Sequence, residues 1–449
     1  MPANIRTNLK KARGYPYKVF FILFILSCQL QTDVNEVRDE SELIHVLNSN
    51  LTNAILQDGF SPPVASRIYA YCNIAAYECL VQRNEAYRSL TTQLNDFSEY
   101  PIVNETSYDE QIALIVAFSE VAKELVYRDY IIDSLQSKLL RRYIMEHDDE
   151  VIAMSLEFGQ SISRHIIEWS SEDGYNKTRN YPLYTPLETS GTWVPTPPTY
   201  KDAIEPYWGE LRTFILDSAS QFTPSPPDAF SPDSGSTFYQ AAYVVYEAVN
   251  NLDSTQLKIA RHWDCNPAVS INTGHMMYAK RQLTPGGHWM GIVRLVTRMK
   301  QLDLLATTNA YTRVSLGIAD GFISSWDEKY RSHLIRPETY IQRYIDVNWR
   351  TILETPMFPE HTSAHSVISA SAATVLTDLF GENFEYLDSV NVPFGLPPRF
   401  FNSFYEAADE AAVSRLYGGI HYRPAIEYGL DQGKEIGTFI VDRLNVLAQ

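Results

Sequence analysis

The sequence predicts an all-α fold, and three observations carry this prediction. Apolar and polar residues alternate at three- and four-residue spacing over long stretches, strand patterns are weak, and Pro-rich segments interrupt the periodic ones. Hydrophobic residues make up 45% and charged residues 20% of the 449 positions, which is ordinary for a globular chain. A chain of this length can bury a substantial core, so we expect a compact helical bundle.

The helical periodicity begins near residue 40 and recurs almost to the C-terminus. The predicted helices are 40–58, 62–83, 108–126, 130–145, 148–172, 236–251, 255–263, 288–305, 307–330, 338–345, 363–380, 402–416 and 425–446. The Pro- and Tyr-rich stretch 181–207 cannot be helical and is expected to wrap the surface in an extended form, and 223–235 is expected to be a loop. Aromatic residues recur in these loops, which favours a single unit over residues 29–449 rather than two domains joined by a linker.

The N-terminus has the pattern of an export signal. Five basic residues precede the apolar run Val19 to Leu26, which is too short to span a bilayer and is followed by Ser27 and Cys28. The Leu-Ser-Cys ending resembles a bacterial lipobox, although an ordinary cleaved signal with an incidental Cys remains the alternative. We therefore expect residues 1–28 to direct export and Cys28 to anchor the protein to a bacterial membrane, at the cell surface or in the periplasm.

The net charge is strongly negative and limits the classes of binding partner. It is −17 for the whole chain and falls to −22 when residues 1–27, with five basic and no acidic residues, are removed. Such a body repels nucleic acid and anionic lipid, so we expect no nucleic-acid partner and membrane attachment only through the lipid anchor. A homodimer is left open.

Three short segments in the last third of the chain carry the candidate chemistry. The first runs from Lys329 to Pro337 and holds Lys329 and Arg336 seven residues apart, within ~20° of one another on a helix. Pro337 is expected to end that helix at Arg336, beside a pocket. On its own, such a pair is more often a solvated basic face.

The second segment runs from Phe358 to His365 and opens the predicted helix 363–380. Thr362 or Ser363 is a suitable N-cap, so the free amides near Ser363 and Ala364 would favour an oxyanion, with His365 in the first turn beside it. His361 and His365 are four apart, but no third ligand lies near them in the sequence and no metal pair is predicted.

The third segment runs from Ser414 to Pro424. Gly418 and Gly419 break the helix, so Arg415 closes one helix and His421 precedes the next. Each segment alone would usually be structural. Together, and in this order, they predict a pocket that binds an oxyanion, within a catalytic core at about 307–449.

This combination resembles the superfamily of vanadium-dependent haloperoxidases and type 2 phosphatidic acid phosphatases. Its pattern K-x6-R-P is matched by Lys329 to Pro337, its P-S-G-H by Thr362 to His365, and its S-R-x5-H by Ser414 to His421. Upstream, Gly286-Gly-His-Trp289 and Trp193-Val-Pro-Thr-Pro-Pro198 are similar to the bacterial haloperoxidase-like branch. The resemblance thus extends over most of the chain and implies the helical bundle of that superfamily.

The resemblance also implies the cofactor and the roles of the residues. Vanadate would be ligated at its apex by His421, and its oxygens would be neutralised by Lys329, Arg336 and Arg415. Ser363 and the Ala364 amide would add donors. His365 would exchange protons with hydrogen peroxide, and Lys329 would polarise the bound peroxide.

Two positions depart from the family pattern. Ala364 stands where the family has Gly, and Ala425 stands where the family has the Asp that orients the histidine. Glu427 or a backbone carbonyl is the expected substitute for that Asp; without one, His421 would be weakened.

Three functions therefore follow from the sequence. The leading one is a vanadate-dependent haloperoxidase that oxidises halide with hydrogen peroxide and passes the product to an organic acceptor. The alternatives are a phosphatase that cleaves phosphate esters through a phospho-histidine, and a ligand-binding lipoprotein with a relic pocket. The halide is not specified, since Phe358 is only a weak marker for it.

Overall fold

The computed structural model describes residues 40–100, 108–267, 269–273 and 276–447, with backbone alone for 269–273 and 276–280. The predicted export signal and lipobox Cys28 lie outside these residues. Within them, no helix combines the length and the apolar character needed to cross a bilayer.

The fold is helical, and each predicted helix is present. The helices are α1 (Glu42–Asp58), α2 (Pro62–Val81), α3 (Glu110–Leu125), α4 (Asp129–Ile144), α5 (Asp149–Ser171), α6 (Tyr175–Thr178), α7 (Thr237–Asn250), α8 (Ser254–His262), α9 (Pro285–Lys300), α10 (Leu304–Ser332), α11 (Pro337–Tyr344), α12 (Ala364–Phe380), α13 (Phe404–Tyr417) and α14 (Arg423–Arg443). Two antiparallel hairpins, β1 (Val269–Thr273) with β2 (Met276–Lys280) and β3 (Tyr386–Asp388) with β4 (Arg399–Phe401), and the 3-10 turns η2 (Trp208–Glu210) and η3 (Val392–Phe394) complete the described structure.

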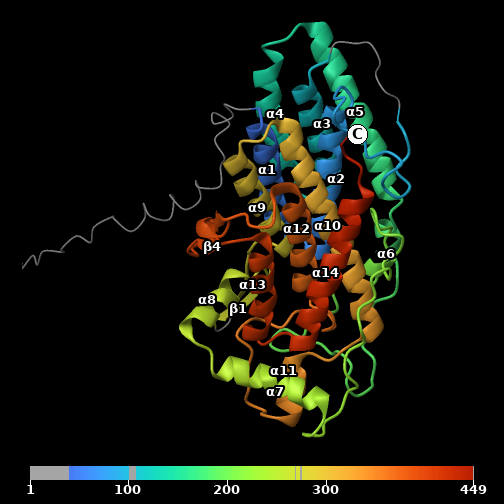
Figure 1. Ribbon diagram of the computed structural model, residues 1–449. Helices are drawn as coiled ribbons and strands as arrows, with labels where there is room; N and C mark the ends of the chain where they lie inside the picture. The colour runs from blue at the N-terminus through green and yellow to red at the C-terminus, as the bar shows by residue number, and fades with distance from the viewer. Residues whose placement is uncertain (1–39, 101–107, 268, 274–275, 448–449) are drawn as a thin grey trace, which may run out of the picture.

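The helices form an elongated bundle (Figure 1). Helices α1 to α5 gather at one end, α7 and α11 lie at the other, and α10, α12 and α14 run between them. One hydrophobic cluster extends from Leu43 in α1 to Val446 after α14, and a smaller one joins α7, α11, α13 and α14. The candidate site residues lie where α10, α12 and α14 approach the end of the bundle that holds α7 and α11.

Two details differ from the sequence-based expectation. The predicted helix 288–305 begins earlier, at Pro285, and ends at Lys300, because Gln301 adopts a left-handed conformation with φ 53°. Asp303 then caps α10 by accepting from the Ala306 amide at 2.7 Å, so α10 begins at Leu304. The two hairpins and the short helix α6 were not predicted, because segments of three to five residues give too short a pattern to read.

Close backbone contact between α12 and α14 fixes the start of α12. A Cβ built on Gly429 would lie 2.8 Å from the Ser363 carbonyl oxygen, and one on Gly433 would lie 2.1 Å from the Val367 carbonyl oxygen. Such spacing admits only glycine at these two positions of α14. The N-terminus of α12, which carries Ser363, is therefore held against α14.

The non-helical stretch 181–207 holds the end of α10. The Trp193 amide donates to the His333 carbonyl at 2.7 Å, and the Ile335 amide donates to the Gly191 carbonyl at 2.9 Å. The buried Trp193 side chain anchors this contact. The extended segment thus positions the turn that leads from Lys329 to Arg336.

Candidate active site

Lys329 and Arg336 meet at the site but do not share a helix. Helix α10 ends at Ser332, His333 takes a left-handed conformation, and Arg336 is the extended N-cap residue of α11. The expected convergence on one helical face is therefore wrong. Pro337 begins the next helix instead of ending the first, as its fixed φ and missing N–H favour at position N1.

The Lys329 ammonium is fully buried and holds the loop before α12. Its Nζ donates to the carbonyls of Pro359 and Glu360 at 3.2 and 3.0 Å, and to the carbonyl of Thr362. These bonds account for all three ammonium protons. Burial and the nearby Arg336 guanidinium lower the pKa of Lys329 well below its usual value. Lys329 therefore shapes the pocket wall and adds positive charge through it.

Ser363 caps α12 as expected. Its Oγ accepts from the Ser366 amide at 3.3 Å and from the Ser366 hydroxyl at 2.9 Å. The first helical hydrogen bond of α12 runs from the Val367 amide to the Ser363 carbonyl, so the Ala364 and His365 amides precede it. These amides, the helix dipole and the Ser363 hydroxyl proton form the donor set that suits an oxyanion.

The hydrogen bonds of His421 fix where its ring proton lies. His421 Nε2 is 3.2 Å from Arg336 Nη1, and a guanidinium nitrogen can only donate, so Nε2 carries a lone pair. His421 Nδ1 is 2.8 Å from Glu360 Oε1, which accepts the ring proton. Burial, then Arg336 and Lys329, lower the pKa of His421 well below its usual value. His421 is thus a neutral imidazole whose Nε2 carries a lone pair that accepts from Arg336, and this is the form required of a ligand or nucleophile.

Glu360 replaces the carboxylate that the family pattern places four residues after the histidine. It also accepts from the Tyr422 amide at 2.9 Å, so it holds both His421 and the backbone that follows. Ala425 contributes only its carbonyl, which accepts from the Ser363 amide at 3.0 Å, and Glu427 is exposed. The expectation that Glu427 or a backbone carbonyl would orient His421 is therefore wrong.

The role of Glu360 was not predicted, although the sequence contains a signal for it. It lies inside the second motif segment, three residues before Ser363, and a carboxylate there in a Pro-flanked loop is costly to bury without partners. Burial raises its pKa to about 7, against the opposing effect of Arg336 and Lys329.

Arg415 completes the basic set from α13. It lies in the last turn of the helix, is 5% exposed, and donates through Nε to Ser414 Oγ at 2.9 Å and through Nη2 to the Trp263 carbonyl at 2.5 Å. Burial lowers its pKa, opposed by Asp264. The charge of Arg415 also lowers the pKa of both His365 and His421.

Two buried polar atoms without partners test whether a tetrahedral oxyanion suits this pocket. Arg336 Nη2 and His365 Nε2 are buried and have no hydrogen-bond partner within the described chain. Unpaired buried polar atoms are costly and need a partner. An oxyanion between Arg336, Arg415 and the start of α12 would accept from Arg336 Nη2 through a negative oxygen and donate to His365 Nε2 through a hydroxyl. The residues present therefore fit vanadate or phosphate, which both keep a hydroxyl at neutral pH. His361 is not assigned to the oxyanion-binding set, because its Nε2 instead contacts the Ser225 carbonyl at 3.1 Å.

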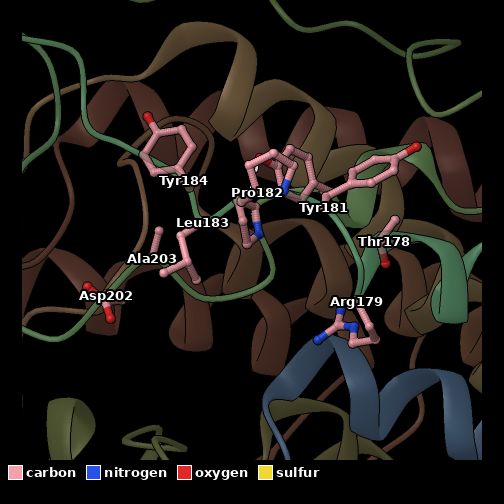
Figure 2. A pocket seen from close by; sticks show the side chains of 10 residues that line it. Thr178, Arg179, Tyr181, Pro182, Leu183, Tyr184, Asp202 and Ala203 are labelled. Carbon is pink, nitrogen blue, oxygen red and sulfur yellow. Dashed lines mark hydrogen bonds between the residues drawn. The ribbon is translucent and has the colours of Figure 1, made fainter.

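A separate surface hollow lies along the extended segment. Tyr181, Tyr184 and Arg179 line it (Figure 2), and a neighbouring hollow is lined by Tyr330 and Trp326 of α10. Neither contains any of the predicted oxyanion-binding residues.

Comparison with known proteins identifies the class. A family profile described as the VCPO second helical-bundle domain matches residues 342–449. A solved structure described as the first bacterial vanadium-dependent iodoperoxidase is 44% identical, with a TM-score of 0.86, over 91% of this chain and 98% of that one. The chain therefore belongs to the bacterial vanadium-dependent haloperoxidases and is an enzyme of that family.

More distant structures share the fold. Holo and apo forms of a bacterial vanadium-dependent chloroperoxidase align over 86% of this chain and 94% of theirs, at 15% and 13% identity and TM-scores of 0.66 and 0.67. No curated protein matches the sequence.

Proposed function

We propose that this haloperoxidase oxidises iodide with hydrogen peroxide at vanadate bound to His421. The observation that carries the proposal is the pair of contacts at His421: Nδ1 lies 2.8 Å from Glu360 Oε1, and Nε2 lies 3.2 Å from Arg336 Nη1. Glu360 therefore accepts a hydrogen bond from Nδ1–H, and the Nε2 lone pair faces Arg336. The choice of iodide rests on the 44% identity to an iodoperoxidase across almost the whole chain.

The residues divide into a binding set and a proton-transfer group. The free donors of Arg336, Arg415, Ser363 and the Ala364 amide would hold the vanadate oxygens, with Lys329 adding charge through the loop that it binds. Bound vanadate would supply the Lewis acidity that makes a peroxide oxygen electrophilic toward iodide.

His365 would move the proton. Burial, and then the Arg415 charge, lower its pKa well below the usual value, so it is a neutral base at neutral pH. Its Nε2 has no partner within the described residues, which leaves it available to accept a proton from hydrogen peroxide and return it to the departing water. An organic acceptor would consume the oxidised iodine in a later step.

The test is a vanadate titration of the apoenzyme, followed by calorimetry and by assays of triiodide formation and monochlorodimedone bromination. We expect stoichiometric vanadate binding and iodide oxidation that appears with it. Turnover of p-nitrophenyl phosphate without vanadate, together with no halide oxidation, would assign the chain to the phosphatase alternative instead.

We also propose that the enzyme is exported and tethered by lipid at Cys28, which follows the basic and apolar segment at the N-terminus. Replacing Cys28 with Ser should move the protein from the membrane fraction to the soluble fraction. If wild-type and variant fractionate alike, the lipid anchor is disproved.

A further inference from the structure

A second buried cluster lies beside the oxyanion pocket and has no role in the chemistry above. His262 ends α8, His288 lies in α9 and Asp388 ends β3. Asp388 Oδ2 is 2.7 Å from His288 Nε2 and 3.1 Å from His262 Nε2, and all three side chains are at most 3% exposed. Three such ligand types within 4.8 Å of one another would also suit a cation, so the protonation of the rings decides between two uses.

Hydrogen-bond partners place protons on the ring nitrogens that face Asp388. Asn391 Nδ2 donates to the His262 carbonyl at 2.8 Å and lies 3.3 Å from His288 Nδ1, so the neutral His288 ring accepts there and keeps its proton on Nε2. The imidazolium form also carries a proton on Nε2. In both forms His288 donates to Asp388 and has no lone pair to offer a cation at that point.

Asp388 Oδ2 is thus the common acceptor of the two ring N–H groups. Burial would raise its pKa, but the His288 charge and the two ring hydrogen bonds outweigh burial and hold the pKa well below the usual value. Its other oxygen, Oδ1, accepts from the Val390 amide at 2.9 Å. We call His262, His288, Asp388 and Asn391 the Asp388 clamp.

The clamp holds Trp263, which lies between His262 and the candidate active site. The Trp263 indole stacks on the His288 ring with centroids 4.6 Å apart and planes 18° apart. Its Nε1 donates to Glu410 Oε1 at 3.0 Å, and Glu410 is itself held by Arg399 Nε at 2.6 Å. The indole is fully buried, so Trp263 is fixed through its ring on one side and through its neighbour His262 on the other.

The backbone of Trp263 then reaches the oxyanion site. Its carbonyl accepts from Arg415 Nη2 at 2.5 Å, the shorter of the two hydrogen bonds described for that guanidinium. A guanidinium binds an oxyanion well only when its donors point at the oxygens, and outer contacts of this kind orient the binding group.

We propose that the Asp388 clamp is a positioning device that aims the Trp263 carbonyl at Arg415 and thereby sets the affinity of the pocket for tetrahedral oxyanions. The proposal rests on the proposed function only in taking Arg415 as an oxyanion donor. Its residues are positioning residues, since none of them contacts the anion in the arrangement described.

The test measures binding of vanadate and, separately, of inorganic phosphate to the apoenzyme by calorimetry. Asp388→Asn keeps the size of the side chain but has no charge and one acceptor oxygen instead of two, so it cannot accept from both ring N–H groups and from the Val390 amide at once. We expect both anions to bind about tenfold more weakly, the lower end of what outer contacts to ligand groups contribute. In an Arg415→Ala background the same change should have less than about a twofold effect, because the clamp would have no guanidinium left to aim.

Asp173→Asn is the matched control. Asp173 is another buried carboxylate, 3% exposed, that accepts from Arg67 Nε at 2.5 Å and from the Tyr71 hydroxyl at 2.9 Å in the N-terminal half of the bundle. We expect this change to lower the unfolding temperature without altering anion affinity. If it weakens anion binding as much as Asp388→Asn does, or if Asp388→Asn acts equally with and without Arg415, the clamp merely stabilises the fold and the proposal is wrong.

A second pair of variants tests the proposal if Asp388→Asn does not fold. His262→Gln retains an amide N–H that can reach Asp388, whereas His262→Leu does not, so anion affinity should be kept by the first and lost by the second. Equal affinity in the two would overturn the proposal, as would a stoichiometric divalent metal found by elemental analysis and lost on Asp388→Asn. Phosphate binding measures the effect of the clamp on Arg415 without any need for vanadate. Wild-type protein that binds phosphate but oxidises no halide would therefore disprove the proposed function, while the phosphate affinities of the variants would still test the clamp.

Discussion

Replacing Glu360 with Gln probes the carboxylate that orients His421. Glutamine keeps the shape and an acceptor oxygen but removes the charge from the bonds to His421 Nδ1 at 2.8 Å and the Tyr422 amide at 2.9 Å. A hydrogen bond to a charged group contributes about 1.5–3 kcal/mol and a neutral one about 1 kcal/mol, so the His421 bond should weaken by about 0.5–2 kcal/mol. Partners of metal-ligating histidines contribute about 10–100-fold in affinity or activity, which is about 1.4–2.7 kcal/mol and overlaps this range.

The same change has an opposing effect that the assay must separate. Without its carboxylate, the positive charge of Lys329 and Arg336 is less balanced, which favours entry of any anion. Phosphate reports this electrostatic effect alone, because it stays tetrahedral and takes no nitrogen ligand when it binds. We therefore expect the ratio of vanadate to phosphate affinity, measured by calorimetry on the apoenzyme at pH 8, to fall about tenfold or more.

The control is Glu427→Gln, which removes an exposed carboxylate nearby in sequence and should leave the ratio unchanged. Thermal unfolding of both variants verifies that they are folded. A Glu360→Gln protein with the wild-type affinity ratio and the wild-type kcat for iodide would refute the role assigned to Glu360 and, with it, the orientation argument for His421.

Three further outcomes are expected. His365→Ala should lower kcat for iodide oxidation about 10²–10⁴-fold while changing the vanadate Kd much less, and equal losses in both would contradict its proton-transfer role. Gly433→Ala should destabilise the fold by about 1–3 kcal/mol in denaturant unfolding, because its Cβ would meet the Val367 carbonyl oxygen at 2.1 Å; Gly235→Ala, with only one atom at 3.7 Å, is the control and should differ little from wild type. Burial lowers the pKa of His45 from 6.5 to about 3, so its contribution to stability is present above pH 6.5 and is lost as the pH falls toward 3. Wild type should therefore lose about 2–3 kcal/mol more than His45→Gln between pH 6.5 and 4.5, and parallel losses would show that His45 does not titrate as described.

The sequence predicted the helices and the composition of the site well, because both depend on local patterns. Apolar spacing marks a helix wherever it occurs, and Ser363 could be recognised as the cap of α12 from its own neighbours. The three basic residues and two histidines stood out because they recur as a spaced set. Their conjunction in one pocket was inferred from the family pattern; within this set the structure shows Arg336 Nη1 in contact with His421 Nε2 at 3.2 Å.

Contacts between distant segments could not be predicted in the same way. Glu360 and His421 are 61 residues apart, and nothing local to either position indicates that they meet. Lys329 and Arg336 do not share a helical face, because the left-handed conformation of His333 ends α10 before Arg336 is reached. Lys329 was expected to hold oxyanion oxygens directly, whereas its three protons are taken by loop carbonyls.

By itself, then, the sequence determined that this protein is a helical bundle, and it predicted an oxyanion pocket from Lys329, Arg336, Ser363, Arg415 and His421. Only the tertiary structure decided which carboxylate orients His421, which atoms of Arg336 and His365 remain free, and what lies behind Arg415. The physical reason is that helix propensity and capping act over a few neighbouring residues. The protonation and direction of a buried side chain instead depend on partners that packing brings together from anywhere in the chain.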